Sequence, residues 1–195
     1  MWSLAASGSM VIAGTESSGL YISTNDGMSW AAANIGFINR NDRNMRSLAI
    51  SGSNIFAGTD GGGVILSSDG GANWAAVNNG FTNSIVRSFA VCGNSLFAGT
   101  MGGVFISSDK GASWSTANNG LKMKAVRSLA VKDSDLLAAT ASGVFLSSSY
   151  GASWTMAGSG LSNSEVVSLA VSDSNIFAGT IHEAHLRQFT NALTI

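Results

Sequence analysis

The sequence predicts an all-β fold, a small β-propeller made of four-stranded antiparallel blades, and three observations carry this prediction. An octapeptide that ends in tryptophan occurs four times at nearly even spacing, at Trp30, Trp74, Trp114 and Trp154. Strand-like apolar runs separated by turn residues fill the intervals, and a period of roughly 40 residues with strand content is typical of propeller blades. Charged residues make up only 11% of the chain, against about 25% in ordinary soluble domains, as expected where stacked blades bury both of their faces.

The third complete unit shows how one blade is assembled. Residues 126–131 alternate large and small side chains, as a strand does, and a polar turn follows. A second strand at 136–140 and a third at 143–147 come next, and the octapeptide then forms a hairpin turn before a fourth strand that starts at Trp154. Four short strands, with turn signals about every 8 to 12 residues, predict one antiparallel blade.

The same strands recur along the chain, which we predict to be a single domain over residues 1–195. The first two strands of the unit occur five times, whereas the third strand and the octapeptide occur four times. We therefore expect five blades, the last one degenerate and completed by the divergent segment 181–195. A piece of a larger propeller is the alternative, in which unpaired strand edges drive association. A closed ring predicts a monomer and a partial ring a homodimer; the units span about 1–36, 46–80, 86–120, 126–160 and 166–195.

Composition excludes several classes of partner. The formal net charge of −1 gives no overall attraction to nucleic acid or to an anionic membrane surface. No apolar run approaches the ~20 residues needed to cross a bilayer. The single cysteine, Cys92, excludes an intrachain disulfide and lies in a strand-like run, where we expect an inert buried thiol. No N-terminal signal is visible, because residues 2–5 already read as a strand, and a cytoplasmic chain and one that has lost its leader stay equally open.

The octapeptides have residue types that suit a tight hairpin turn. A short carboxylate two residues before glycine accepts bonds from backbone N–H groups of its own turn. Glycine permits the positive φ that such a turn needs, and tryptophan buries a large area in the outer core. We predict a structural role and no metal, since calcium requires clustered oxygen ligands that this pattern lacks. The residues concerned are Asp69 and Asp109, Gly27, Gly71, Gly111 and Gly151, and Trp30, Trp74, Trp114 and Trp154.

The pattern Ser-x-Asp-x-Gly-x-Ser-Trp resembles the Asp-box, or bacterial neuraminidase repeat, and the resemblance covers nearly the whole chain when the strands between the boxes are counted. Asn25 and Ser149 replace the aspartate in the outer two copies, which depart from the pattern. The resemblance implies a structural turn between the third and fourth strands, away from the ligand face. Propellers of this type include sialidases, other glycoside hydrolases, sortilin-type receptors and photosystem II assembly factors, and they are often extracytoplasmic. Their activities differ widely, so the shared fold selects none of them.

The sequence argues against sialidase-like catalysis. That chemistry needs a tyrosine nucleophile with a partner glutamate, and a further acid on the ligand face. Of the two tyrosines, Tyr21 lies in a predicted third strand and Tyr150 lies in a hairpin turn at the opposite end. We therefore predict a protein without catalytic residues, metal or cofactor.

Charges separate between the two ends of the predicted blades. The end where the innermost strand begins collects seven basic and four acidic residues, and the opposite end is acidic. Arg46, Arg87 and Arg127 occupy the same position in three consecutive units, at the mouth of the predicted channel. Converging guanidinium groups suit a carboxylate or phosphate. The candidate anion or partner site comprises Arg46, Arg87, Arg127, Arg40, Arg43, Lys122 and Lys124.

Three functional hypotheses follow. The first is a non-catalytic binding or assembly module that presents this basic end to an anionic ligand, an acidic protein or an acidic glycan. The second is a sialidase-like glycoside hydrolase propeller, or a fragment of one. The third is a purely structural repeat ring, in which each arginine pairs internally with a carbonyl or an acid.

Overall fold

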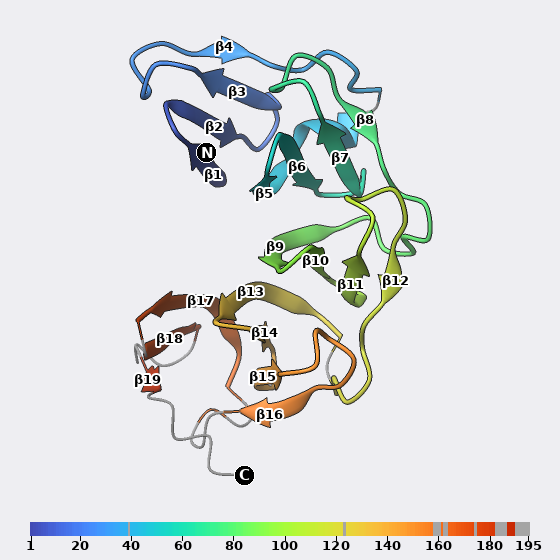
Figure 1. The fold of residues 1–195 in the computed structure, drawn as a ribbon, viewed down its shortest axis with the longest axis vertical. Coiled ribbons are helices and arrows are strands. Elements are labelled where there is room, and N and C mark those ends of the chain that lie inside the picture. Colours follow the sequence, from blue (N-terminus) through green and yellow to red (C-terminus); the bar gives the residue numbers. More distant parts are fainter. Residues whose placement is uncertain are drawn as a thin grey trace.

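The computed structural model of the chain describes residues 1–38, 40–122, 124–157, 161, 164–173 and 175–181, together with the backbone of 187–189. These residues form five antiparallel sheets (Figure 1), which confirms the predicted all-β propeller fold. The strands of each sheet are paired in chain order. They are, in sheet one, β1 (Ser3–Ser7), β2 (Met10–Gly14), β3 (Leu20–Ser23) and β4 (Ala31–Ala32); in sheet two, β5 (Met45–Ser51), β6 (Asn54–Thr59), β7 (Val64–Ser67) and β8 (Ala75–Ala76); in sheet three, β9 (Val86–Cys92), β10 (Ser95–Thr100), β11 (Gly103–Ser107) and β12 (Ser115–Thr116); in sheet four, β13 (Val126–Lys132), β14 (Asp135–Thr140), β15 (Gly143–Ser147) and β16 (Thr155–Ala157); and in sheet five, β17 (Val166–Ser172), β18 (Asn175–Thr180) and β19 (Arg187–Phe189).

The predicted strand limits hold closely in sheet four, with one instructive difference. The first three strands match β13, β14 and β15 to within one residue, but β16 begins at Thr155 rather than at Trp154. The backbone N–H of Trp154 donates instead to the carbonyl of Asn119, which follows sheet three, at 2.8 Å. The tryptophan therefore links two sheets and does not begin a strand.

Sheet five takes its third strand from the divergent C-terminal segment. Strand β19 pairs with β18, and Ala178 lies opposite Arg187 while Ile176 lies opposite Phe189. The tail thus extends the last blade to three strands, as expected for a degenerate unit. The rest of segment 181–195, beyond Ile181 and β19, lies outside the described residues.

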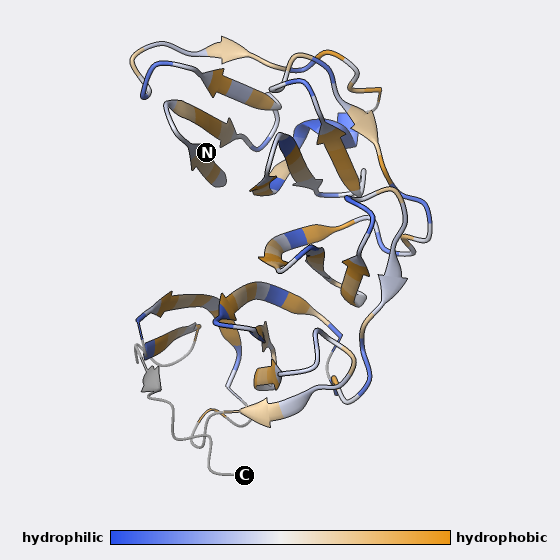
Figure 2. Cartoon of the chain, viewed as in Figure 1, coloured by the Kyte–Doolittle hydropathy of each residue, from blue (hydrophilic) through white to orange (hydrophobic). Residues whose placement is uncertain are grey.

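Successive sheets pack face to face, and the two faces of each sheet differ. We call front the face that packs against the preceding sheet, and back the face that packs against the following one. In sheet two the front carries Leu48, Ile55 and Ile65, which join the back of sheet one in a single cluster, and the back carries Phe56 and Val64, which join sheet three. Two further clusters join sheet three to four, with Cys92 buried as expected, and sheet four to five. Figure 2 shows the resulting apolar strands and polar connections.

The five sheets follow an open arc, with β1, β5, β9, β13 and β17 on its concave side (Figure 1). Within the described residues no apolar cluster joins sheet one to sheet five. The consequence is visible at the repeated tryptophans. Trp74, Trp114 and Trp154 are buried as expected, but Trp30, in sheet one, is 43% exposed.

The octapeptide turns are closed by a small side-chain network. In sheet two, the Ser67 hydroxyl accepts from the backbone N–H of Gly71 and donates to the Asp69 carboxylate, both at 2.8 Å. The same carboxylate accepts from the backbone N–H of Asn73 at 2.9 Å and from its side-chain amide at 2.8 Å. These bonds, led by the Asn73 side chain, lower the pKa of Asp69 from 3.8 to about 2.

The outer copies keep this turn without the carboxylate. In sheet one the Asn25 side-chain oxygen accepts from the Ser29 N–H at 2.9 Å, and in sheet four the Ser149 hydroxyl accepts from the Ser153 N–H at 3.1 Å. The glycine of each turn adopts a positive φ of 80° to 91°, as the sequence predicted; these glycines are Gly27, Gly71, Gly111 and Gly151. Any short side chain with an acceptor oxygen therefore completes the turn.

Candidate functional site

A β-bulge presents the arginines at the inner edge of the arc. In sheet two, Met45 lies opposite Thr59 and Ser47 lies opposite Gly58, so Arg46 is an extra residue between two ladder positions. The same irregularity occurs at Arg87, Arg127 and Val167 in the next three sheets. A bulged residue is left out of the pairing and its side chain is turned away from the regular direction. The bulge therefore places one side chain from each of sheets two to five on the inner rim.

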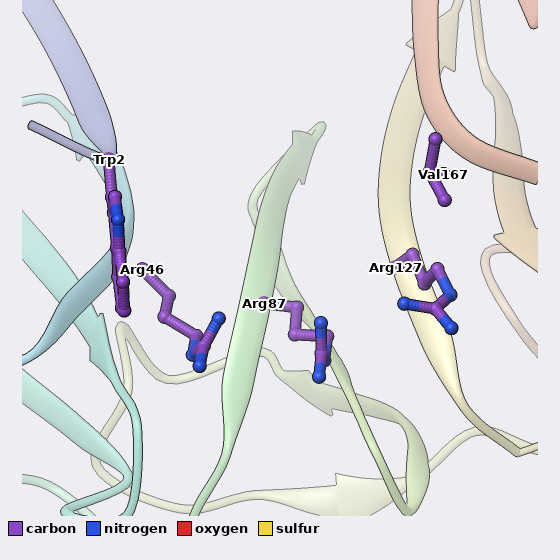
Figure 3. A pocket seen from close by; sticks show the side chains of 5 residues that line it. All are labelled: Trp2, Arg46, Arg87, Arg127 and Val167. Carbon is purple, nitrogen blue, oxygen red and sulfur yellow. The ribbon is translucent and has the colours of Figure 1, made fainter. Parts of the chain in front are cut away.

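These side chains form a row that lines one shallow pocket. In Figure 3 the row runs from Trp2, which precedes β1, to one residue from each of sheets two to five in order: Arg46, Arg87, Arg127 and Val167. The pocket has a volume of about 280 Å³ and is lined by these residues. We call them the rim. The structure thus brings together the three arginines that the sequence aligned, with an aromatic side chain at one end and an aliphatic one at the other.

Two of the three arginines form ion pairs. Arg46 donates from Nη2 to the carboxylate of Asp60, and Arg127 donates in the same way to Glu165. The Nε atoms of both arginines are buried without a hydrogen-bond partner in the described part of the chain. The guanidinium carbon of Arg46 also lies 4.6 Å from the ring centroid of Trp2, a cation–π contact. Arg46 and Arg127 are therefore held in place from within the protein.

Arg87 differs from its two neighbours. Its Nε donates to the sulfur of Met101 at 3.1 Å, and no carboxylate of the described residues pairs with it. Burial lowers the pKa of Arg87 below its usual value, and the positive charges of Arg46 and Arg127 lower it further. An anion bound beside Arg87 would offset both effects, because it favours the charged form of the guanidinium.

Two positions in the repeat decide which arginine forms an ion pair, and the sequence analysis did not use them. The residue after the second strand is Asp60 in sheet two but Met101 in sheet three and Ala141 in sheet four. The residue just before the inner strand is Glu165 in sheet five, whereas the matching residue in sheet four is Ala125. Arg87 has an uncharged residue at both of its register positions, whereas each of the other two arginines has one acid. Aligning these columns identifies Arg87 as the unpaired arginine from sequence alone.

The other predicted basic residues lie outside the pocket. Arg40 and Arg43 lie in a 3₁₀ turn, η1 (Arg40–Arg43), that leads into sheet two, and Lys122 and Lys124 lie in the connection that leads into sheet four. All four are exposed, and none lines the rim. They add positive charge to the connections that enter the inner strands, but the structure does not bring them together with Arg87.

Potential metal ligands are dispersed over the sheets. In the part of the chain that the structure describes, no group of three or more His, Cys, Asp or Glu side chains is placed to hold a metal ion. No helix among the described residues has the length and apolarity to cross a bilayer.

Comparison with solved structures shows what the fold resembles. A xyloglucanase of the GH74 type from Xanthomonas campestris aligns with 97% of this chain at a TM-score of 0.73 and 15% identity, over 36% of its own length. YCF48 bound to a D1 peptide aligns with 88% of this chain at 0.68 and 13% identity, and the computationally designed Ika8 protein aligns with 96% at 0.69 and 14% identity. The chain spans 57% of the length of both YCF48 and Ika8.

At these identities the likeness establishes the fold and nothing finer. No curated protein matches the sequence. A family model does match it, over residues 25–175, which include the whole of sheets two, three and four. The chain belongs to the DUF6242 beta propeller domain family.

Proposed function

We propose that this propeller is a non-catalytic binding module that holds an anionic group of a protein partner at its rim, with Arg87 as the principal contact. The observation that carries the proposal is the row of three guanidinium groups in one pocket, of which the middle one has no carboxylate partner among the described residues. A carboxylate or phosphate bound there accepts two parallel N–H bonds from a planar guanidinium.

The residues around Arg87 favour a localised binding site rather than a diffuse patch of positive charge. Asp60 and Glu165 neutralise Arg46 and Arg127, so the rim and these two carboxylates together carry one net positive charge, located at the centre of the row. Trp2 and Val167 offer apolar surface at either end of the row. The site therefore suits an acidic group next to an apolar one, as a peptide provides. A peptide is also what the structural neighbour YCF48 binds.

The structural turns are proposed to take no part in binding. They lie between the third and fourth strands, as the Asp-box resemblance implies, at the opposite end of the sheets from the rim. In sheet two this follows from register, since Ser67 begins the turn opposite Ile55, whereas the rim end is marked by Gly58 opposite Val64. Their side-chain acceptors are occupied within the turn.

A glycoside hydrolase role is the second hypothesis, because one neighbour is a xyloglucanase. Hydrolysis needs two carboxyl groups free to act as acid, base or nucleophile. The carboxylates next to the rim, Asp60 and Glu165, each form an ion pair with an arginine, which favours binding over catalysis. Release of product from a fluorogenic sialoside or from xyloglucan oligosaccharides, absent in a heat-inactivated sample, would overturn the non-catalytic proposal.

Binding of a defined acidic peptide tests the proposal. The probe is a fluorescein-labelled peptide of alternating Glu and Leu, compared with the same peptide carrying Gln in place of Glu, and anisotropy is the readout. Arg87→Gln is expected to weaken binding of the acidic probe about tenfold or more, since a hydrogen bond to a charged group contributes about 1.5–3 kcal/mol. The Gln probe is expected to bind wild type and variant equally weakly.

Arg40→Gln is the matched control, because it removes the same charge at the same end but outside the pocket. It is expected to change the dissociation constant less than twofold. Equal affinity of wild type and Arg87→Gln for the acidic probe would refute the rim as the site. Equal losses of affinity in Arg87→Gln and Arg40→Gln would instead mean that overall charge, and not the pocket, determines binding of the acidic probe.

A further inference from the structure

The sulfur of Met101 occupies the place beside Arg87 that a carboxylate occupies beside Arg46. Met101 and Asp60 each follow the second strand of their sheet directly, and each accepts a hydrogen bond from the bulged arginine of that sheet. The partner of Arg46 is an anion, whereas the partner of Arg87 is a neutral thioether, which is a weak acceptor. The charge of Arg87 is therefore left uncompensated because of the residue at position 101.

The same position in the other sheets carries residues of a different chemistry. It is the residue after the Ala-Gly-Thr or Ala-Ala-Thr that ends each second strand. The residues there are Glu16 in sheet one, Asp60 in sheet two, Met101 in sheet three, Ala141 in sheet four and Ile181 in sheet five. Among these five, the methionine alone has a sulfur that can take up one oxygen atom and lose it again.

Met101 is accessible to a small oxidant and lies against the candidate site. It is 40% exposed, and its sulfur lies 3.1 Å from Nε of Arg87. The side chain has three rotatable bonds, so it can draw back to make room for an oxygen atom on the sulfur. Both residues belong to sheet three, which packs against sheets two and four. The contact therefore depends on an internal sheet alone.

Oxidation by a hydroperoxide turns this weak acceptor into a strong one. A lone pair of the sulfur attacks the hydroxyl oxygen of the peroxide, and the S–O bond forms as the O–O bond breaks. The hydroxyl proton passes to the departing oxygen, which leaves as water or as an alcohol. The sulfur loses two electrons, the peroxide gains them, and the product is a polar sulfoxide. Beside Arg87, the sulfoxide oxygen accepts N–H bonds that a bound anion would otherwise accept.

We propose that Met101 is a modification site, and that its reversible oxidation to the sulfoxide weakens anion binding at Arg87. The inference rests on the proposed function, because it concerns regulation of the same site. In the oxidised protein the pair of Arg87 and Met101 resembles the pair of Arg46 and Asp60, with a neutral dipole in place of the full charge. A competing neutral hydrogen bond is expected to weaken anion binding about two- to tenfold.

Treatment of the whole chain with hydrogen peroxide tests the inference. Peptide mass spectrometry measures the gain of one oxygen atom at Met101. After the peroxide is removed, anisotropy of the fluorescein-labelled peptide of Glu and Leu measures binding. The oxidised wild type is expected to bind this probe about two- to tenfold more weakly than the untreated protein. Methionine sulfoxide reductases, one for each epimer of the sulfoxide, are expected to restore the affinity.

Three variants separate Met101 from the other methionines. Met101→Leu removes the sulfur and is expected to bind the probe like the wild type, before and after peroxide. Met28→Leu is the matched control, because Met28 is 86% exposed but lies outside the pocket, and it is expected to keep the full loss on oxidation. Met101→Gln supplies an amide oxygen as acceptor and is expected to bind as weakly as the oxidised wild type without any treatment. Unfolding midpoints check that each variant is folded.

A second readout follows Arg87 in the absence of any ligand. Its side-chain Nε–H resonance, assigned by its loss in Arg87→Gln, is recorded in proton–nitrogen correlation spectra. The resonance is expected to shift when the wild type is oxidised, because the acceptor changes from sulfur to oxygen. Peroxide treatment of Met101→Leu is expected to leave it in place.

The outcomes separate this inference from the proposed function. A fully oxidised Met101 with unchanged affinity and an unchanged Arg87 resonance would overturn the inference and leave binding at the rim intact. So would an equal peroxide effect in Met101→Leu, or a Met101 that resists peroxide while Met28 is oxidised. An acidic probe that does not bind the untreated wild type would overturn the proposed function, and the regulation of binding with it.

Discussion

Sheets one and three are copies of one repeat, yet the same tryptophan has different surroundings in each. Trp114 is 5% exposed; its indole N–H donates to the carbonyl of Val77 at 2.9 Å and its backbone N–H to that of Asn79. Both acceptors belong to the preceding unit. Trp30 is 43% exposed, and its indole N–H reaches only Gly27 of its own turn, at 3.0 Å. The stabilisation available to a repeated residue therefore depends on the neighbouring sheet.

The largest expected effect is at these tryptophans. Trp114→Ala should destabilise the fold by about 3–5 kcal/mol, since it removes a buried ring and leaves the Val77 carbonyl without its donor. Trp30→Ala should cost about 1–2 kcal/mol, because its ring is only partly removed from water. Urea unfolding at low protein concentration measures both. Equal losses would show that burial by the preceding sheet does not set the contribution.

The inner strands offer a similar, smaller contrast. Leu129→Ala should cost about 2–3 kcal/mol, because Leu129 is 7% exposed within the cluster between sheets three and four. Leu4→Ala should cost less than about 1 kcal/mol in the monomer, since Leu4 is 54% exposed. Thermal unfolding of the two variants side by side provides the measurement. A Leu4→Ala loss as large as that of Leu129→Ala would mean that the front of sheet one is covered in the monomer.

The smallest expected effect concerns acid. Hydrogen bonds from Ser113 and Ser107 lower the pKa of Asp109 from 3.8 to about 2, and Asp69 behaves alike. A lowered folded-state pKa contributes stability above pH 3.8 that is lost as the pH falls towards about 2. Sheet one has Asn25 at this position, which does not titrate and therefore adds no pH-dependent stability.

Replacing both carboxylates tests that assignment. Asp69→Asn with Asp109→Asn should keep the turns, as Asn25 does, and should flatten the decline of the unfolding midpoint between pH 3.8 and about 2. The turn of sheet four, which uses Ser149, supplies a natural comparison. An unchanged decline would assign the acid sensitivity to other carboxylates.

Much of the fold could be predicted because repetition makes register visible. The even spacing of the octapeptides identified the blades, and the alignment of Arg46, Arg87 and Arg127 placed them on one rim. The bulges could not be predicted, since the extra residue appears only when two strands are paired. The open arc corresponds to the partial ring that the sequence left as the alternative to a closed one. The sequence could not decide between them, because the front and back faces have the same residue pattern in every copy and only the arrangement in space shows which faces meet.

The sequence aligned the three arginines that line one pocket, but it did not predict which of them are paired with acids. Asp60 and Glu165 were counted as acids of the same end, but their pairing with Arg46 and Arg127 spans a turn in one case and two sheets in the other. Arg40, Arg43, Lys122 and Lys124 were grouped with the rim on charge alone, and their connections hold them outside the pocket. A count of charges identifies the basic end of the molecule. Which charges pair there can be predicted only when the register of the strands is known.

The bulge at the start of the inner strand in sheets two to five separates the identity of the rim side chain from the strand pairing. A residue that lies outside the ladder can change without disturbing the strand pairs on either side, and Arg127 and Val167 already occupy equivalent bulges in adjacent sheets. If the proposed binding at the rim holds, ligand preference would change one blade at a time, through exchange of single side chains that leave the strand pairing intact.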